Sequence, residues 1–236
     1  MSGADRVLLA IDTATSRAVA ALGDPRGILL EEVGWEAGYR HGEELLSRIV
    51  ELLDAAQRQR QLLAGVIVGT GPGAFTGLRI GLATAKTLAH ELRLPIVGVS
   101  SALALAHAAV ERGARPPIAV LLPAGPSGLV VADVTWAAPG GELSDAGARL
   151  VNGSDTDVRA GSTAVAVDLD GRTDPVAGRL GQEARSGLAA SLVALGAARL
   201  ARGEHDDVAE LVPEYVSLPR GVTAAAGEVA WSLDPR

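Results

Sequence analysis

Short apolar runs separated by turn residues predict a strand-rich start to this chain. Residues 6–11, 18–22 and 28–33 are each mostly apolar, and a turn rich in glycine and proline separates the second run from the third. Consecutive strands joined by short connections pair antiparallel. We therefore expect a three-stranded meander at the start of the fold.

Beyond the meander, the apolar period changes to that of helices. Residues 41–56 carry an apolar stripe wide enough to serve two neighbours, and this pattern predicts a helix. Residues 66–68 predict a buried strand, a second helix follows to about residue 92, and residues 95–99 predict another strand. A meander followed by alternating helices and strands implies right-handed crossovers and a mixed sheet.

A second half begins near residue 101 and has weaker patterns. Its expected helices lie at residues 101–112 and 188–202, and its expected strands at residues 118–122, 129–134 and 164–167. We accordingly divide the chain into a first subdomain (1–100), a second subdomain (101–218) and a tail (219–236) that lacks a strong period.

A glycine-rich stretch joins the strand at 66–68 to the helix that follows it. Residues 69–77 read GTGPGAFTG, and Thr76 is the expected N-cap of the helix. Such loops can bind phosphate because their N–H groups and the helix dipole point the same way. The spacing fits neither the P-loop nor the dinucleotide fingerprint. Either Gly71 and Gly73 belong to a phosphate site, or the loop is a tight turn that docks the helix.

Small residues recur along one face of this second helix. Gly77, Gly81, Ala85 and Ala89 lie at every fourth position and so form a ridge. Glycine inside a helix costs roughly 1 kcal/mol relative to alanine, so close packing should offset that cost. The spacing leaves two interpretations open, which are packing against the chain's own sheet and contact with a helix of a partner.

Composition and charge narrow the classes of protein. The 236 residues include no cysteine, which excludes disulfides and thiolate metal sites. The formal charge is −7, and no basic run is present, so we expect no strong binding of RNA by this chain alone. The first residues do not resemble a signal peptide and no segment approaches membrane-spanning length. We therefore expect a cytoplasmic protein with no membrane contact.

The stretch GPGAFTGLRIG at residues 71–81, together with Ile11-Asp12-Thr13, resembles the TsaB (YeaZ) family. The similarity is clear over roughly the first hundred residues, judged by the length of this motif. It returns in Pro213-Glu214-Tyr215-Val216, which is similar to the family's closing Pro-x-Tyr-Leu. The resemblance implies an α/β fold of the actin-like, ribonuclease-H-like type. Two lobes on mixed, five-stranded-type sheets are expected, with the second lobe reduced.

The resemblance also implies a role and partners. It implies a non-catalytic scaffold or activator subunit that binds a TsaD-type protein, which transfers a threonylcarbamoyl group to the tRNA adenosine next to the anticodon. A TsaE-type ATPase would be a third member, homodimers would use the same helices, and tRNA would be contacted only through the complex. The interface expected on this basis comprises His41, Leu45, Ile49, Leu53, Gly77, Arg79, Gly81, Ala85 and Ala89.

One carboxylate lies where the actin-like fold binds a nucleotide. Asp12 ends the first strand, where that fold holds an acid near the metal and phosphates. The matching stretch of the second half, residues 121–126, reads LLPAGP and has no acid, whereas the family often has Asp-Ala-Arg there. Because a magnesium–phosphate site depends on its carboxylates, we expect Asp12, Gly71 and Gly73 to form only a remnant of a nucleotide site. Asp12 would then hydrogen bond a turn, and ATP would bind only at the level of the complex.

Catalytic and metal-ligating residues are not apparent. The catalytic partner TsaD carries a His-x-x-x-His pair after a Gly-Val, and here Ser101 and Leu105 hold those positions. A leucine offers no donor to a metal, and His107 falls two residues late. No Gly-x-Ser-x-Gly elbow is present. The alternative function is a stand-alone ATP-dependent kinase or hydrolase of the actin-like superfamily that uses Asp12 and the glycine loop.

Overall fold

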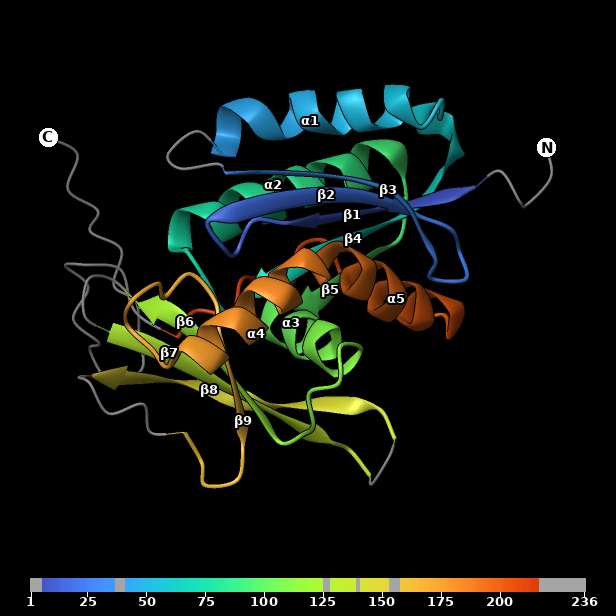
Figure 1. Ribbon diagram of the computed structural model, residues 1–236. Coiled ribbons are helices and arrows are strands. Elements are labelled where there is room, and N and C mark those ends of the chain that lie inside the picture. The colour runs from blue at the N-terminus through green and yellow to red at the C-terminus, as the bar shows by residue number, and fades with distance from the viewer. Residues whose placement is uncertain (1–5, 37–40, 125–127, 139–140, 153–157, 217–236) are drawn as a thin grey trace, which may run out of the picture.

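The computed structural model describes residues 6–36, 41–124, 128–138, 141–152 and 158–216, which form two sheets with helices on and between them (Figure 1). The first sheet has five strands in the order β3-β2-β1-β4-β5. The second has four strands in the order β8-β7-β6-β9. The tail expected at residues 219–236 lies outside the described residues.

The first sheet begins with the predicted meander. Strands β1 (Val7–Asp12), β2 (Arg17–Gly23) and β3 (Leu29–Glu36) pair antiparallel in sequence order. Strands β4 (Leu63–Gly71) and β5 (Ile96–Ser100) then run parallel to β1. The mixed sheet is therefore confirmed, although β4 is longer at both ends than the apolar run that predicted it.

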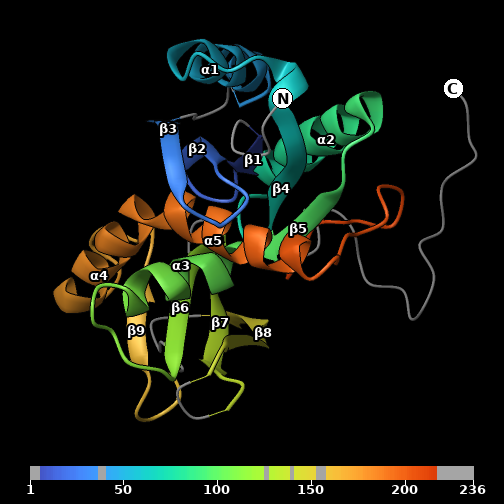
Figure 2. The same cartoon turned by 90° about the vertical axis from the view of Figure 1, so that its right-hand side faces the viewer.

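Two pairs of helices enclose the first sheet. Helices α1 (His41–Ala55) and α2 (Phe75–Leu92) cover one face, and a short 3-10 turn, η2 (Arg60–Leu62), leads from α1 into β4. Helices α3 (Ser101–Val110) and α5 (Leu188–Ala201) lie on the opposite face, between the two sheets (Figure 2). The strands β1, β2 and β4 are consequently buried on both faces.

The second sheet repeats the order of the first with one strand fewer. Strands β6 (Ile118–Ala124), β7 (Gly128–Trp136) and β8 (Leu143–Asn152) form a meander, and β9 (Thr163–Ala166) runs parallel to β6. Helix α4 (Pro175–Ser186) follows β9 and packs against it. This lobe is thus a reduced copy of the first, as expected for a ribonuclease-H-like pair.

The second expected subdomain, residues 101–218, contributes a helix to the first sheet. Helix α5 packs on β1, β2, β4 and β5, so the end of the chain returns to the first sheet. Residues 203–216, termed here the C-terminal strap, then run along β5. The amide of Asp206 donates to the carbonyl of Ile96, and the Asp206 carboxylate accepts from the amide of Gly98 at 2.6 Å. The strap therefore covers the otherwise open edge of that strand.

Strand β8 and helix α4 were not predicted from the sequence. Strand β8 lacks a clean alternation of apolar and polar residues and contains Gly147 with φ +99°, at a register shift against β7. Helix α4 contains two glycines and few apolar residues. Its Asp174 N-cap and Pro175 at the first position were nevertheless local signals that could have predicted it.

Apolar clusters lie on both sides of the first sheet. One joins α1 and α2 to the sheet, and a larger one joins α3, α4 and α5 to both sheets. Among the described residues, none of the helices combines the length and the hydropathy that crossing a bilayer requires.

Candidate functional site

Asp12 lies at the C-terminal end of β1 and is wholly buried. Its carboxylate accepts hydrogen bonds from the amide of Ala14 at 2.8 Å and from the Ser101 hydroxyl at 2.6 Å. The Ser101 hydroxyl in turn accepts from the amide of Gly71 at 3.1 Å. Burial raises the pKa of Asp12, and these hydrogen bonds oppose the rise. Asp12 therefore ties together the ends of β1 and β4 and the start of α3.

The glycine loop packs onto the turn that follows β1. A Cβ at Gly73 would lie 2.3 Å from the carbonyl oxygen of Ala14, which also accepts from the amide of Ala74 at 2.8 Å. Gly71 has φ +105°, a conformation that side chains disfavour. Helix α2 begins at Phe75 with Ala74 as its N-cap, so the expectation that Thr76 caps the helix is wrong. The chain's own backbone occupies the space against Gly73.

The remaining opening beside this loop is small. A cavity of about 160 Å³ lies between the loop, the end of β6 and the strap, and its lining includes Gly73, Pro123 and Tyr215. Small-molecule sites usually measure roughly 300–1,000 Å³. The β6 residues that line it, Pro123 and Ala124, carry no acid. In this conformation the cavity is too small for a nucleotide and offers no carboxylate from β6.

These contacts give structural roles to the residues of the expected remnant of a nucleotide site, which itself stays a prediction. The structure does bring Asp12, Gly71 and Gly73 close together, through Ser101 and Ala14. However, Asp12 has no exposed surface, and its hydrogen bonds are those of a turn and a helix start. The geometry thus supports the simpler interpretation of Asp12. It gives no support to the alternative of a stand-alone kinase or hydrolase built on these residues.

The ridge of small residues on α2 faces the interior of this chain. Gly77, Gly81, Ala85 and Ala89 are all buried. A Cβ at Gly81 would lie 2.1 Å from the hydroxyl oxygen of Thr13, which donates to the carbonyl of Gly77. Close approach of Thr13, which follows β1, therefore accounts for Gly81. The expectation that these four residues contact a partner is wrong, because the chain's own first sheet covers them.

Helix α1 is also divided into an inner and an outer face. Leu45 and Ile49 are buried against the first sheet, which corrects their place in the expected interface, and Leu53 is half-buried. Leu46 and Val50 point outward instead, with exposed fractions of 54% and 56%. His41 begins the helix, but its side chain lies outside the described residues. The outward apolar pair is thus the face of α1 that this chain leaves uncovered.

Arg79 is the one residue of the expected interface on α2 that is exposed. Its guanidinium carbon lies 4.1 Å from the ring centre of Phe75, and its Nε donates to the Tyr215 hydroxyl at 2.9 Å. The rings of Phe75 and Tyr215 are themselves 5.0 Å apart. Since Tyr215 belongs to the strap, the closing motif of the sequence serves to hold Arg79 in one orientation at the surface.

A second polar cluster joins the two lobes and was not found from the sequence. Asp168 follows β9 and accepts from the amide of Ser16 at 2.6 Å and from its hydroxyl at 2.8 Å. Arg185 of α4 donates to the same carboxylate at 2.8 Å. Asp168 has φ +57°, an uncommon conformation for a residue with a side chain. We call Ser16, Asp168 and Arg185 the interlobe clamp.

The two residues at the positions of TsaD's metal-binding histidines, Ser101 and Leu105, have structural roles here. Ser101 is buried and hydrogen bonds Asp12, whereas Leu105 is buried in the apolar core. Within the described ranges, no group of three or more histidine, aspartate or glutamate side chains converges in a way that could hold a metal ion.

Comparison with known proteins places this geometry in a family. A family model for TsaD, described as tRNA N6-adenosine threonylcarbamoyltransferase, matches residues 33–156, just over half of the chain. An uncharacterized protein of Mycobacterium leprae is 40% identical over 99 residues, which make up 40% of this chain and 27% of that protein. The tRNA threonylcarbamoyladenosine biosynthesis protein TsaB of Bacillus subtilis is 35% identical over 99 residues, 42% of this chain and 43% of that protein.

A solved structure extends the similarity over almost the whole chain. YeaZ from Pseudomonas aeruginosa superposes with a TM-score of 0.70 at 27% identity, covering 89% of this chain and 99% of that one. The two curated sequence matches span less than half the length of each relative. The family model, the sequence relatives and the shared two-lobed actin-like fold agree with one another. This chain belongs to the TsaB (YeaZ) family.

Proposed function

We propose that this protein is a non-catalytic subunit of the machinery that makes threonylcarbamoyladenosine in tRNA. In this role it binds a TsaD-type subunit, which carries the transfer chemistry. The relatives named for this pathway support the proposal, as does the burial of Asp12, whose carboxylate is hydrogen bonded within the chain. A TsaE-type ATPase and the tRNA then join through the complex rather than through this chain alone.

The outer face of α1 carries the proposal. Leu46 and Val50 lie one helical turn apart and are more than half exposed. The same pair of helices carries further half-buried apolar residues, Leu53 on α1 and Ile80 and Leu88 on α2. A stripe of this kind fits an amphipathic helix of another protein. This is the surface we assign to the partner, in place of the small-residue ridge.

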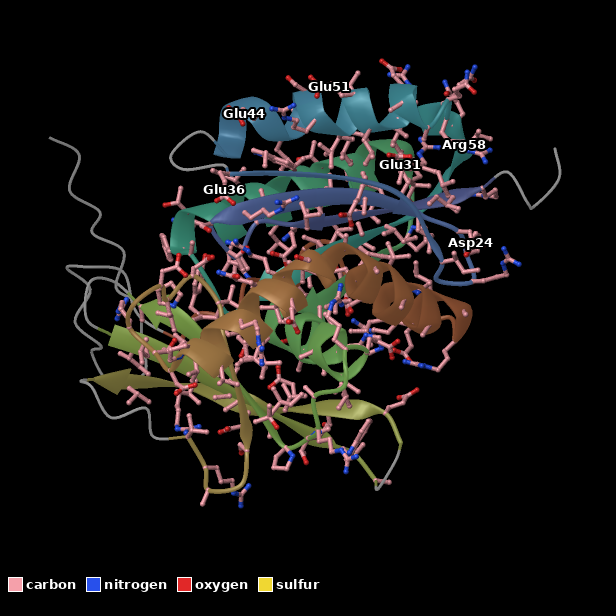
Figure 3. The ribbon with its side chains drawn as sticks, in the orientation of Figure 1. Asp24, Glu31, Glu36, Glu44, Glu51 and Arg58 are labelled. Atoms are coloured by element: carbon pink, nitrogen blue, oxygen red, sulfur yellow. The ribbon has the colours of Figure 1, made fainter. Side chains whose placement is uncertain are left out.

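The charge around the stripe indicates the chemistry of the partner. Helix α1 contains four carboxylates and one arginine, and Arg48 pairs with Glu51 at 3.0 Å. Figure 3 shows Glu44 and Glu51 on α1, with Glu31 and Glu36 on the neighbouring β3. An acidic rim around an apolar centre favours a partner surface that is apolar at its centre and basic at its edge. The same rim disfavours self-association, because a second copy presents the same charge.

The test is co-purification with the TsaD-type subunit of the same cells. Val50→Glu places a charge in the centre of the stripe and should weaken the complex by tenfold or more, since a buried unpaired charge opposes association. Val176→Glu on α4 is the matched control, because Val176 is 55% exposed and lies away from α1. The threonylcarbamoyladenosine content of tRNA, measured by mass spectrometry in cells carrying each variant, reports the function.

Three outcomes separate the possibilities. Loss of the complex and of the modified nucleoside with Val50→Glu alone supports the proposal. Equal co-purification of both variants would rule out the α1 face as the interface. A loss of dimers by Val50→Glu, with the TsaD-type complex unchanged, would assign the stripe to self-association.

A further inference from the structure

Helices α3 and α5 lie on the opposite side of the first sheet from α1 and α2 (Figure 2). Residues of both helices line a cavity of about 630 Å³. The end of β5 and the hairpin between β7 and β8 form its other walls. Its volume falls within the roughly 300–1,000 Å³ of small-molecule sites. The cavity is thus large enough for a ligand, and it is separate from the surface assigned to a partner.

Small side chains on α5 keep this space open. Ala194 and Ala198 lie one turn apart in the wall, and the backbone of Gly98 on β5 also lines the cavity. Leu103 and the half-buried indole of Trp136 supply larger apolar surfaces. The cavity opens to solvent, because the lining residues Glu111, Glu142 and Ala198 are exposed. An apolar wall that includes an indole favours a ligand with an aromatic body.

The chain itself neutralises the two arginines of the cavity. Arg199 lies 3.1 Å from the Asp206 carboxylate and 3.0 Å from that of Glu204. Arg202 lies 2.6 Å from Glu204 and 3.5 Å from Glu142, which also lines the cavity. Both guanidinium groups therefore have carboxylate partners. An anionic ligand would have to compete with these partners for them.

Glu111 supplies a carboxylate that is not balanced in this way. Within the described part of the chain, no ion pair is formed by this carboxylate. His107, one turn earlier on α3, has its pKa lowered by burial, an effect that Glu111 partly offsets. The imidazole is therefore mainly neutral at pH 7, and its Nδ1 lies 3.0 Å from the Ser191 hydroxyl. The lining thus combines an apolar wall with a negative charge.

We propose that this cavity binds a small aromatic molecule that carries a protonated amine. The ring packs against Trp136 and Leu103, and the ammonium group lies toward Glu111. Carboxylate attraction and the face of an indole both favour a cation at such a place. The proposal does not depend on the binding of a TsaD-type partner.

Isothermal titration calorimetry with two probes of similar size tests the proposal. 2-Phenylethylamine and 3-phenylpropionate share a ring and differ in charge. The amine should bind saturably, about tenfold or more tightly than the acid. Ala198→Leu fills the cavity and should weaken binding of the amine by about tenfold, whereas Ala190→Leu, at an exposed position of α5 outside the lining, should leave it unchanged. Glu111→Gln should reduce the preference for the amine.

Each opposite result overturns a defined part of the proposal. The absence of saturable binding of the amine overturns the site. Binding that survives Ala198→Leu places the amine elsewhere on the protein. A preference for 3-phenylpropionate overturns the assignment of charge. Circular dichroism checks that each variant is folded, which is expected because Ala198, Ala190 and Glu111 are exposed.

Discussion

The hydroxyl of Thr13 donates a hydrogen bond of 2.7 Å to the carbonyl of Gly77, across 64 positions of the chain. This contact holds the first turn of α2 against the end of β1, because Thr13 directly follows the buried Asp12, the last residue of that strand. The same hydroxyl would lie 2.1 Å from a Cβ at Gly81, so a larger residue at that position would separate the two elements. This part of the family motif thus packs α2 against the end of β1 within the same chain.

The first prediction concerns the two glycines at positions 81 and 178, both inside helices. Gly81→Ala adds a Cβ 2.1 Å from the Thr13 hydroxyl, whose rotation would break its hydrogen bond. We expect the free energy of unfolding to fall by about 1–3 kcal/mol. Gly178→Ala meets nothing within 4 Å and should raise it by up to about 1 kcal/mol. Urea titration measures both values. Equal effects of the two changes would contradict the close packing of α2 on β1.

The second prediction concerns the pH dependence of stability at Asp12. Burial raises the pKa of this carboxyl in the folded state, so between the ordinary value of 3.8 and the raised value the native state holds more protons than the unfolded state. The contribution of Asp12 to stability therefore decreases as pH rises through that window, and stays low above it. The total decrease grows with the difference between the folded and unfolded pKa of this carboxyl.

Asp12→Asn isolates this effect because its side chain does not ionise. Urea titrations of both proteins from pH 4 to pH 8 should show the stability difference moving in favour of Asp12→Asn as pH rises. Asp12→Ala also loses the hydrogen bonds from Ala14 and Ser101 and should be less stable than either. A difference between wild type and Asp12→Asn that stays constant over this range would show that burial does not control this carboxyl.

The third prediction concerns the interlobe clamp. Asp168→Ala removes the acceptor of Ser16 and Arg185 and should lower the free energy of unfolding by about 1–3 kcal/mol. It should also speed amide exchange at Ser16, whose N–H loses its acceptor. Asp170→Ala, at an exposed position in the same loop, is the matched control and should change both quantities little. Hydrogen exchange that is identical in the two variants would show that the clamp does not join the lobes.

The fourth prediction concerns the C-terminal strap. Asp206→Ala removes the acceptor of the Gly98 amide and of Arg199, and should expose residues 203–216 to limited proteolysis. The neighbouring Asp207→Ala removes only a local bond to the amide of Ala209 and should change the cleavage rate much less. Cleavage sites are read by mass spectrometry. Equal protection of the strap in both variants would mean that Lys86 and Tyr215 suffice to hold it.

The sequence predicted the first lobe well because the apolar pattern that defines each of its elements lies within one short segment. The meander, both helices and the parallel strands each carry a period that is visible within one segment, and the turn role of Asp12 depends on Ala14 only two residues away. The same holds for the spacing of Gly77 and Gly81. Their pattern shows that they share a face, but it cannot show that Thr13 lies opposite.

The contacts that the sequence did not predict are long in range. Ser16 and Asp168 are 152 positions apart, and neither residue type is unusual in its own segment. The outward direction of Leu46 and Val50 also depended on which side of α1 the sheet occupied, since the stripe is apolar on both sides. The close packing of α4 on β9 was not predicted from the sequence. Gly181 permits this packing, but it also lowers the helix propensity of the segment.

The return of α5 to the first sheet has a consequence during synthesis. When only the first hundred residues have left the ribosome, α5 has not yet been made. The face of the first sheet that α5 later covers, with Leu8, Ile67 and Val97, is then exposed to water. That face is covered only when residues near 201 have emerged. Nascent chains interrupted before this point should bind chaperones that hold exposed apolar surfaces, whereas chains that include α5 should escape them.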